Sequence, residues 1–175
     1  MKTKKKKQTT PRLGIDFGKV IMGAVINGKE DTSFLGTTFE QAMTSPATSG
    51  AVEAVTQLVD LFDGEVWIVS KCGPSVEKKT KGWLKHHEFY RTTGLDPKRV
   101  RFCRQRPEKA KICRQLGITH FIDDRIDVLT PMVGIVPHLF LFGEQKSGTP
   151  IPDYVWPVTD WEQTLAAILP ETVSR

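Results

Sequence analysis

The stretch THFIDDRIDVL, residues 119–129, places a short apolar run directly before two adjacent aspartates. The run around Phe121 and Ile122 is typical of a buried strand, and Asp123 and Asp124 follow at its end. Two neighbouring carboxylates repel each other, and each is costly to remove from water. Such a pair alone is typical of a solvated loop. At the end of a buried strand, however, we expect a positively charged group beside it.

Further apolar runs alternate with helical patterns along the chain. Strands are predicted for RLGIDFG (12–18), EVWIVSK (65–71), RVRFC (99–103), ITHFI (118–122) and HLFLF (138–142), with DYVWPVTDW (153–161) as a candidate edge strand. Helices are predicted from about Ser49 to Phe62, Pro74 to Tyr90, Pro107 to Leu116 and Asp160 to Leu169. The pair Asn27-Gly28 predicts a β-hairpin after the first strand.

This alternation predicts an α/β fold: a three-layer, Rossmann-like parallel sheet of about five strands with helices on both faces. In such sheets ligands bind at the carboxyl ends of the strands. Asp16, Ser70 and the pair Asp123-Asp124 each stand at or just past a predicted strand end, and Lys109 stands near the start of the helix before the last of these strands. We therefore expect these side chains to meet at one edge of the sheet.

In this order, these residues resemble the four motifs of the haloacid dehalogenase (HAD) superfamily. IDFGKV is similar to its first motif, VWIVS to its second, the lysine of PEKAKIC to its third and FIDDR to its fourth. The resemblance extends from about Leu13 to Phe142. It implies a HAD-like, Mg²⁺-dependent phosphohydrolase that acts through an aspartyl-phosphate intermediate.

The resemblance also implies a role for each matching residue. Asp16 is the expected nucleophile. Ser70 and Lys71 are expected to bind the phosphoryl group of the substrate, and Lys109 to neutralise charge on the nucleophile and on the transferring group. Lys111 is the alternative third-motif lysine. Helical spacing favours Lys109, which lies on the same face as the apolar residues that follow it.

The metal site implied by the resemblance uses oxygen ligands, which Mg²⁺ prefers. The expected ligands are Asp16, the backbone carbonyl of Gly18, Asp123 and Asp124. Arg125 and Asp127 are expected to support this cluster from outside.

Gly18 departs from the family pattern. Phosphatases of this superfamily have a second aspartate at this position, which protonates the leaving group and then activates water. General acid–base assistance is worth about 10²–10⁴-fold in rate. Its absence implies a slow phosphatase, a different chemistry, a substrate with a good leaving group, or a metal- and phosphate-binding protein with little turnover. The four histidines are candidates to replace it: His86, His87, His120 and His138.

The chain leaves no room for the large cap domain that many superfamily members carry. Uncapped relatives act on large substrates, so a macromolecular or nucleotide phosphate is the expected substrate. Residues 1–11 form a basic tail with five lysines (Lys2, Lys4, Lys5, Lys6 and Lys7), expected to be disordered. The tail could contact nucleic acid, direct nuclear import or aid solubility. In another interpretation, the tail binds nucleic acid and the whole chain is a nucleic-acid-associated interaction protein.

Composition sets the remaining expectations. The whole chain carries 25 Lys and Arg against 20 Asp and Glu, so the part after the tail is formally neutral and composition reveals no basic binding face. We expect a single domain over residues 12–175. No apolar run is long enough to span a membrane, and no signal-peptide core is evident. Three cysteines without zinc-ligand spacing indicate free thiols. A cytoplasmic location is expected, or a nuclear one in a eukaryote.

Overall fold

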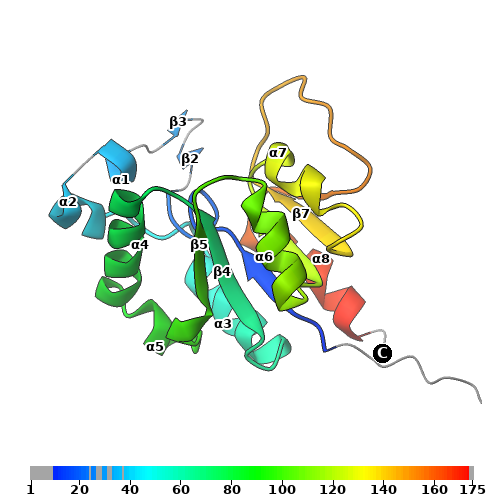
Figure 1. Ribbon diagram of the computed structural model, residues 1–175, viewed down its shortest axis with the longest axis horizontal. Helices are drawn as coiled ribbons and strands as arrows, with labels where there is room; N and C mark the ends of the chain where they lie inside the picture. Colours follow the sequence, from blue (N-terminus) through cyan, green and yellow to red (C-terminus); the bar gives the residue numbers. More distant parts are fainter. Residues whose placement is uncertain (1–9, 24, 27–28, 31–32, 37, 174–175) are drawn as a thin grey trace, which may run out of the picture.

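A parallel sheet of six strands forms the centre of the computed structural model, which describes residues 10–23, 25–26, 29–30, 33–36 and 38–173 (Figure 1). Its strand order is β5-β4-β1-β6-β7-β8. The strands are β1 (Leu13–Ile15), β4 (Val66–Lys71), β5 (Val100–Cys103), β6 (His120–Asp123), β7 (His138–Phe142) and β8 (Trp156–Val158). The six strands are the five predicted ones and the candidate edge strand, which pairs with β7.

The short strand β1 lies inside the sheet, between β4 and β6. Ile15 aligns with Ile68 on one side and Ile122 on the other. A strand covered on both faces carries a continuous apolar run, which matches the complete burial of β1. Its central residue is a glycine for a steric reason: a Cβ at Gly14 would lie 2.4 Å from the ring of Phe121.

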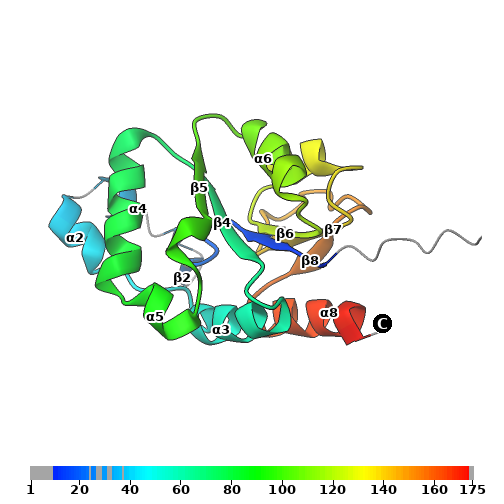
Figure 2. The same ribbon diagram turned by 60° about the horizontal axis from the view of Figure 1, so that its bottom comes forward.

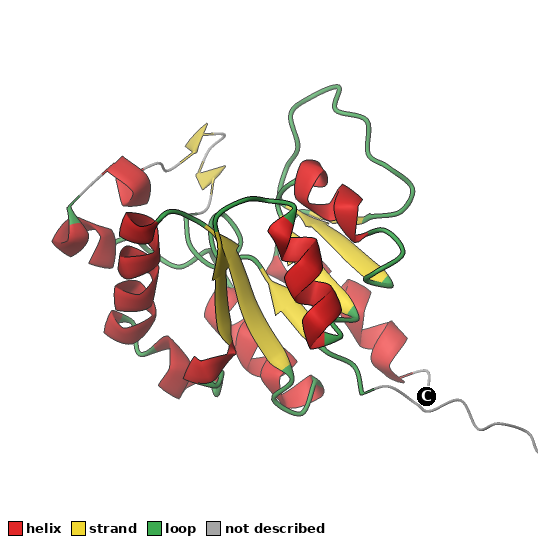
Figure 3. Ribbon diagram, in the orientation of Figure 1, coloured by secondary structure: helices red, strands yellow, loops and turns green. Residues whose placement is uncertain are grey.

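Helices cover both faces of the sheet (Figures 2 and 3). One face packs against α3 (Ala51–Leu61) and α8 (Trp161–Val173), the other against α6 (Glu108–Leu116) and α7 (Ile126–Leu129). Alternate strand residues point into two separate cores, so Ile68 packs in the first core and Val69 in the second. The predicted three-layer α/β architecture is confirmed.

The helix predicted from Pro74 to Tyr90 is two helices, α4 (Pro74–His86) and α5 (Phe89–Thr93). Glu88 breaks the pattern with a left-handed backbone, φ 50°, and the turn allows α5 to bury Phe89 and pack against α3. His87, at the end of α4, is exposed, and its Nε2 lies 2.7 Å from the backbone oxygen of Met43. Its ring lies against that of Trp83, with centroids 4.3 Å apart and the ring planes tilted by 31°.

The segment between β1 and α3 contains the predicted hairpin and two helices that were not predicted. The hairpin consists of β2 (Val25–Ile26) and antiparallel β3 (Lys29–Glu30); its predicted turn, 27–28, lies outside the described residues. The helices are α1 (Ser33–Gly36) and α2 (Phe39–Met43), the second of which begins with a capping box. Gly82 permits α2 to approach α4, because a Cβ there would lie 2.4 Å from Phe39.

Two short 3₁₀ helices complete the described structure, η1 (Pro97–Arg99) and η2 (Thr130–Met132). No large cap domain is present in the described part of the chain, as predicted. Within these ranges, no helix is both long and apolar enough to cross a bilayer. The five lysines of the predicted basic tail precede the first described residue, Thr10.

Candidate active site

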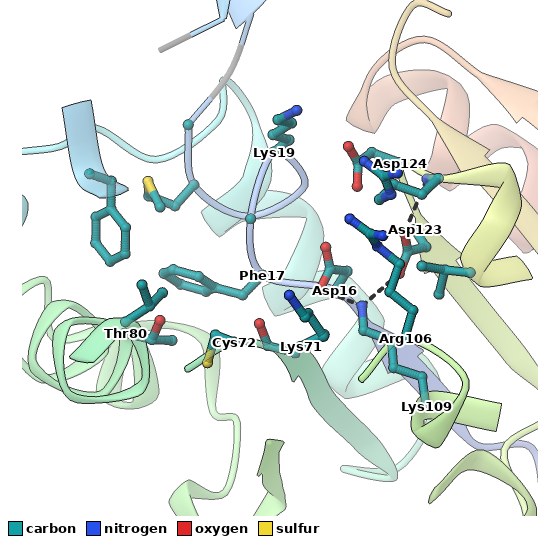
Figure 4. Close-up of a pocket in the computed structure, with 18 residues that line it drawn as sticks. Asp16, Phe17, Lys19, Lys71, Cys72, Thr80, Arg106, Lys109, Asp123 and Asp124 are labelled. Atoms are coloured by element: carbon teal, nitrogen blue, oxygen red, sulfur yellow. Dashed lines mark hydrogen bonds and ion pairs between the residues drawn. The ribbon is translucent and has the colours of Figure 1, made fainter. Parts of the chain in front are cut away.

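A buried lysine joins two aspartates at the carboxyl edge of the sheet (Figure 4). Lys109 Nζ donates to Asp16 Oδ1 at 2.7 Å and to Asp123 Oδ2 at 2.7 Å. Asp16 directly follows β1, Asp123 ends the neighbouring strand β6, and Lys109 extends from the first turn of α6. Lys109 is only 2% exposed and Asp123 is completely buried. Lys109 is thus the positive group expected beside the aspartate pair.

The start of α6 determines which lysine reaches this position. Glu108 Oε2 accepts the backbone N–H groups of Arg104 and Gln105, which fixes the turn that leads into the helix. Lys109 then shares the buried face of α6 with Ala110 and Cys113. Lys111 is exposed on another face and does not line the site.

Asp124 brings a third carboxylate to the cluster. Carboxylate oxygens of Asp16, Asp123 and Asp124 lie within 4.8 Å of one another. With all three ionised, and Lys109 protonated, the four side chains carry two net negative charges in a mostly buried site. Hard carboxylate oxygens at this spacing, with an excess negative charge of two, fit a divalent cation such as Mg²⁺.

The pKa values of Lys109, Asp123 and Asp124 are shifted by burial and by the charges of their neighbours. Burial lowers the pKa of Lys109, but Asp16 and Asp123 outweigh burial and raise it above its ordinary value. Burial, and then repulsion from Asp16, raises the pKa of Asp123 well above its ordinary value, although Lys109 opposes this. The same two causes raise the pKa of Asp124 to about 6. A bound cation would favour the ionised form of both carboxyls.

The other residues expected at the site line one cavity with this cluster. It has a volume of about 270 Å³, and Ser70, Lys71 and Gly18 are among its lining residues. Ser70 is buried near the end of β4, whereas Lys71, the last residue of that strand, is exposed. Gly18 has no left-handed backbone, and a Cβ there would meet nothing within 4 Å. The fold therefore has space for a side chain at the position where the family has its second aspartate.

Three further basic residues line the cavity: Lys19, Arg106 and Arg125. The Nε–H group of Arg125 donates a hydrogen bond to Asp127 Oδ1 at 2.9 Å. Its backbone N–H donates another to Asp123 Oδ1 at 3.1 Å. Arg125 therefore connects the carboxylate cluster to Asp127. Arg106 lies 3.6 Å from Asp127 and was not predicted. The sequence signal that could have indicated Arg106 is its position between the end of β5 and the start of α6, the helix of Lys109.

The opposite wall of the cavity is mostly apolar and was also not predicted. It is formed by residues of the loop after β1, of α1, of the loop after β4 and of α4, namely Phe17, Met22, Phe34, Cys72, Val76 and Thr80 (Figure 4). The rings of Phe17 and Phe34 lie 5.9 Å apart. Burial raises the pKa of Cys72 to about 11, so this thiol is neutral at physiological pH. No histidine is among the residues that line the cavity, so none of the four is placed to replace the missing aspartate.

Comparison with solved structures identifies the fold. A HAD-superfamily hydrolase from Ehrlichia chaffeensis is similar over 96% of this chain and 100% of that chain, with a TM-score of 0.60 at 11% sequence identity. No protein-family model matches the sequence, and neither does any curated protein. This chain therefore has a HAD-like fold, as its four motifs predicted, and at this identity the likeness establishes the fold alone.

Proposed function

We propose that this protein is a HAD-like, Mg²⁺-dependent phosphohydrolase in which Asp16 is the nucleophile. One observation carries the proposal: buried Lys109 bridges Asp16 and Asp123, with Asp124 completing the carboxylate cluster at the carboxyl edge of the sheet. An ion pair that served stability alone could lie anywhere in the core. This one lines an open cavity together with Ser70 and several cations.

In the proposed first step, a carboxylate oxygen of Asp16 attacks the phosphorus atom of a phosphomonoester. The bond between phosphorus and the ester oxygen breaks, and its electron pair leaves on that oxygen, which gives an aspartyl-phosphate. Lys109 holds Asp16 in position through Oδ1, which leaves Oδ2 for the attack. Ser70 and Lys71 are proposed to bind the phosphoryl oxygens. In the second step, water attacks the aspartyl-phosphate, releases inorganic phosphate and restores Asp16.

Asp16, Asp123, Asp124 and the carbonyl of Gly18 are the proposed holders of Mg²⁺. When bound, the ion offsets the repulsion between the phosphate and the carboxylates. With Lys109 as its only positive charge, the carboxylate cluster keeps a net negative charge. Without the ion, the cluster would therefore repel a dianionic phosphate. Lys19, Arg106 and Arg125 contribute positive charge at the same cavity, which raises the local concentration of an anionic substrate.

Gly18 determines which of the two steps is limiting. A glycine transfers no proton, so the ester oxygen departs unassisted and the attacking water has no base from this position. A good leaving group overcomes the first difficulty but not the second. The aspartyl-phosphate should therefore form faster than it breaks down. The same residue favours a second candidate function, a phosphate-binding protein with little turnover.

The test is the time course of p-nitrophenolate release from p-nitrophenyl phosphate, with and without Mg²⁺. We expect a Mg²⁺-dependent burst of about one equivalent per protein, followed by a slow steady rate. Asp16→Asn should abolish both phases. Gly18→Asp should raise the steady rate by about 10²–10⁴-fold, the usual effect of a general acid–base group, and the open space at this position accepts the new side chain.

Two results would change the assignment. Equal turnover by wild type and Asp16→Asn would remove Asp16 as the nucleophile. No turnover by wild type, together with activity in Gly18→Asp, would establish the second candidate, an intact phosphate site without its proton-transfer group.

A further inference from the structure

The open side of the cavity is ringed by basic side chains. The residues of this basic rim, all at exposed or partly exposed positions, are Lys19, Lys71, Arg106 and Arg125. Figure 4 shows Lys19, Lys71 and Arg106 around Asp16. The side chains of Arg106 and Arg125 are each 44% exposed, whereas that of Asp16 is 11% exposed. Cations that an incoming ligand can reach therefore lie outside a largely buried nucleophile.

The basic rim carries more charge than one phosphate requires. Together with Lys109, it gives the cavity five basic lining residues against three acidic ones, an excess of two positive charges. Mg²⁺ in the proposed site would raise the excess to four. A phosphate dianion offsets two of these charges, and Asp127, which pairs with Arg125 beside the cavity, offsets one more. Positive charge remains for a second anionic group.

Arg106 is the rim residue best placed to receive that group. Its carbonyl accepts the backbone N–H of Lys109 at 3.1 Å, which closes the turn that begins α6. Residues three apart in a helical turn are neighbours on one side of it, so Arg106 stands next to Lys109 and nearer to solvent.

The donors of Arg106 are not taken up by the carboxylate beside it. Arg125 engages Asp127 through two hydrogen bonds, at 2.9 and 3.2 Å. Arg106 lies 3.6 Å from the same carboxylate, which is too far for a hydrogen bond. Within the described part of the chain its guanidinium donates no hydrogen bond. A guanidinium in this state suits a phosphate, which it can bind through two N–H groups at once.

The geometry of phosphoryl transfer places the leaving group at this rim. The attacking and leaving oxygens lie roughly in line through the phosphorus atom. Asp16 attacks from the closed end of the cavity, where Lys109 holds its carboxylate, so the leaving group points toward the open side. A second anionic group bound by Arg106 therefore belongs to the leaving group.

The absence of a proton donor at Gly18 favours a leaving group of the same kind. An alkoxide departs poorly without a proton, because a hydroxyl group such as that of water has a pKa of about 15.7. A phosphate group has a second pKa of about 6, so it is stable as a dianion at neutral pH and departs without a proton. Gly18 and the basic rim are separate features of the chain, and both favour a phosphate as the leaving group.

We infer that the substrate of the proposed phosphohydrolase is a diphosphate, in which Asp16 attacks the terminal phosphate and Arg106 binds the second. The inference rests on the proposed function and narrows it. The bond between the terminal phosphorus and the bridging oxygen breaks, and its electron pair stays on that oxygen, so the second phosphate leaves as an anion. Water then hydrolyses the aspartyl-phosphate to inorganic phosphate, and the proton that the water loses passes to the solvent.

The size of the cavity agrees with this substrate. Its volume of about 270 Å³ lies just below the usual range for ligand sites, about 300–1,000 Å³. The diphosphate itself is small, and any group attached to the second phosphate would extend past the basic rim into solvent.

The experiment measures binding without turnover, by calorimetric titration of the wild-type protein at a constant excess of Mg²⁺. Methylenediphosphonate is the diphosphate probe, because a carbon atom replaces the bridging oxygen and the link cannot be hydrolysed. Methylphosphonate is the single-phosphate probe, and phosphonoacetate carries a carboxylate in place of the second phosphate. We expect methylenediphosphonate to bind on the order of 10–100-fold more tightly than methylphosphonate, the usual effect of hydrogen bonds to charged groups. Phosphonoacetate should bind less tightly than methylenediphosphonate.

Three variants assign this gain to Arg106. Arg106→Gln should remove about tenfold or more of the preference for methylenediphosphonate and leave methylphosphonate binding nearly unchanged, which also shows that the variant is folded. Arg106→Lys keeps the charge without the planar fork of donors and should retain part of the preference. Arg114→Gln removes an exposed arginine in the last turn of α6. It is the matched control and should retain the preference in full.

A further probe distinguishes two sources of the diphosphate. It is adenosine 5′-(α,β-methylene)diphosphate, whose terminal phosphate is joined through carbon to one that carries a nucleoside. Tighter binding than methylenediphosphonate assigns a nucleoside diphosphate as the substrate, and equal or weaker binding assigns inorganic pyrophosphate.

The possible failures are distinguishable. Equal affinities for methylphosphonate and methylenediphosphonate would overturn the diphosphate inference and leave the phosphate site in place. Phosphonoacetate that binds as tightly as methylenediphosphonate would overturn it too, because the rim would then recognise any second anion. An unchanged preference in Arg106→Gln would remove Arg106 from the site. If neither methylphosphonate nor methylenediphosphonate binds, the proposed function fails and the inference fails with it.

Discussion

At the scale of single residues, Lys109 has the largest electrostatic role in the site. It neutralises part of the charge of two aspartates that lie on neighbouring strands, and its own burial is tolerated only because both ion pairs are short. Removing it leaves carboxylates of Asp16 and Asp123 facing each other in a buried place. The lysine is therefore expected to stabilise the fold as well as to serve the proposed chemistry.

Lys109→Met, which keeps an unbranched apolar stem, should lower the free energy of unfolding by about 3–5 kcal/mol, the usual cost of breaking a buried ion pair on one side. Lys111→Met is the matched control on the exposed face of the same helix and should change stability by no more than about 0.5 kcal/mol. Urea denaturation without Mg²⁺ measures both values. Equal stability of the two variants would contradict the role given to Lys109.

The sequence predicted the polar residues of the site better than its apolar wall. Asp16, Ser70 and Asp123 could be placed together because parallel strands end at a common edge, and Lys109 because helical spacing turned it toward the apolar face. Thr80 carried no such signal. Its burial depends on the segments that pack against α4, which is a property of the folded chain.

At the scale of elements, the central strands β1, β4, β6 and β7 were predictable because each lies in a compact apolar run. The helices that were not predicted are short. They are α1, α2 and α7, which have four or five residues each, too few for a helical period to appear. The break between α4 and α5 was missed because Glu88 is an unusual residue for a left-handed backbone. Tertiary packing of Phe89, rather than local preference, determines that turn.

Glu65 connects three strands at the edge opposite the site. It lies just before β4 and pairs with Arg12, just before β1, and with Arg99, just before β5. The guanidinium of Arg99 also lies 4.2 Å from the ring centroid of Trp67. The hydrogen bond from Arg99 is the main cause that lowers the pKa of Glu65 below 4.5.

Because the pKa of Glu65 is lowered by folding, its ion pairs stabilise the protein above pH 4.5 and are lost as the pH falls through the folded-state pKa. Glu65→Gln should lower the free energy of unfolding by about 1 kcal/mol at neutral pH. The difference from wild type should shrink as the medium is acidified below pH 4.5. Glu53→Gln, at an exposed position of α3, is the control. A pH-independent difference for Glu65→Gln would contradict the linkage.

At the scale of the whole molecule, the two edges of the sheet have different tasks. The amino edge holds the ion pairs of Glu65, and the carboxyl edge holds the carboxylate cluster, whose mutual repulsion the proposed cation would offset. A ligand that binds only the folded state stabilises it in proportion to the logarithm of its concentration. Metal binding should therefore be visible as a change in global stability.

Mg²⁺ at a hundredfold excess over its Kd should add about 2.7 kcal/mol, which corresponds to roughly 5–10 °C in Tm for a chain of this size. Asp123→Asn should abolish this shift, since it removes a proposed ligand. Asp153→Asn, in an exposed loop, should retain it in full. Thermal melts with and without Mg²⁺ measure the shifts. An undiminished shift in Asp123→Asn would exclude Asp123 from the metal site.

The open space at Gly18 has a consequence for the history of this protein. Two of the four glycine codons become aspartate codons by one base change in their second position, so few mutations separate this chain from the standard first motif of the superfamily. Nothing in the local packing opposes that change, since a Cβ at this position would meet no atom within 4 Å. The fold does not require the glycine. A change to aspartate at this position would therefore alter the proposed reaction, through the lifetime of the phospho-aspartate, while the packing around it stays as it is.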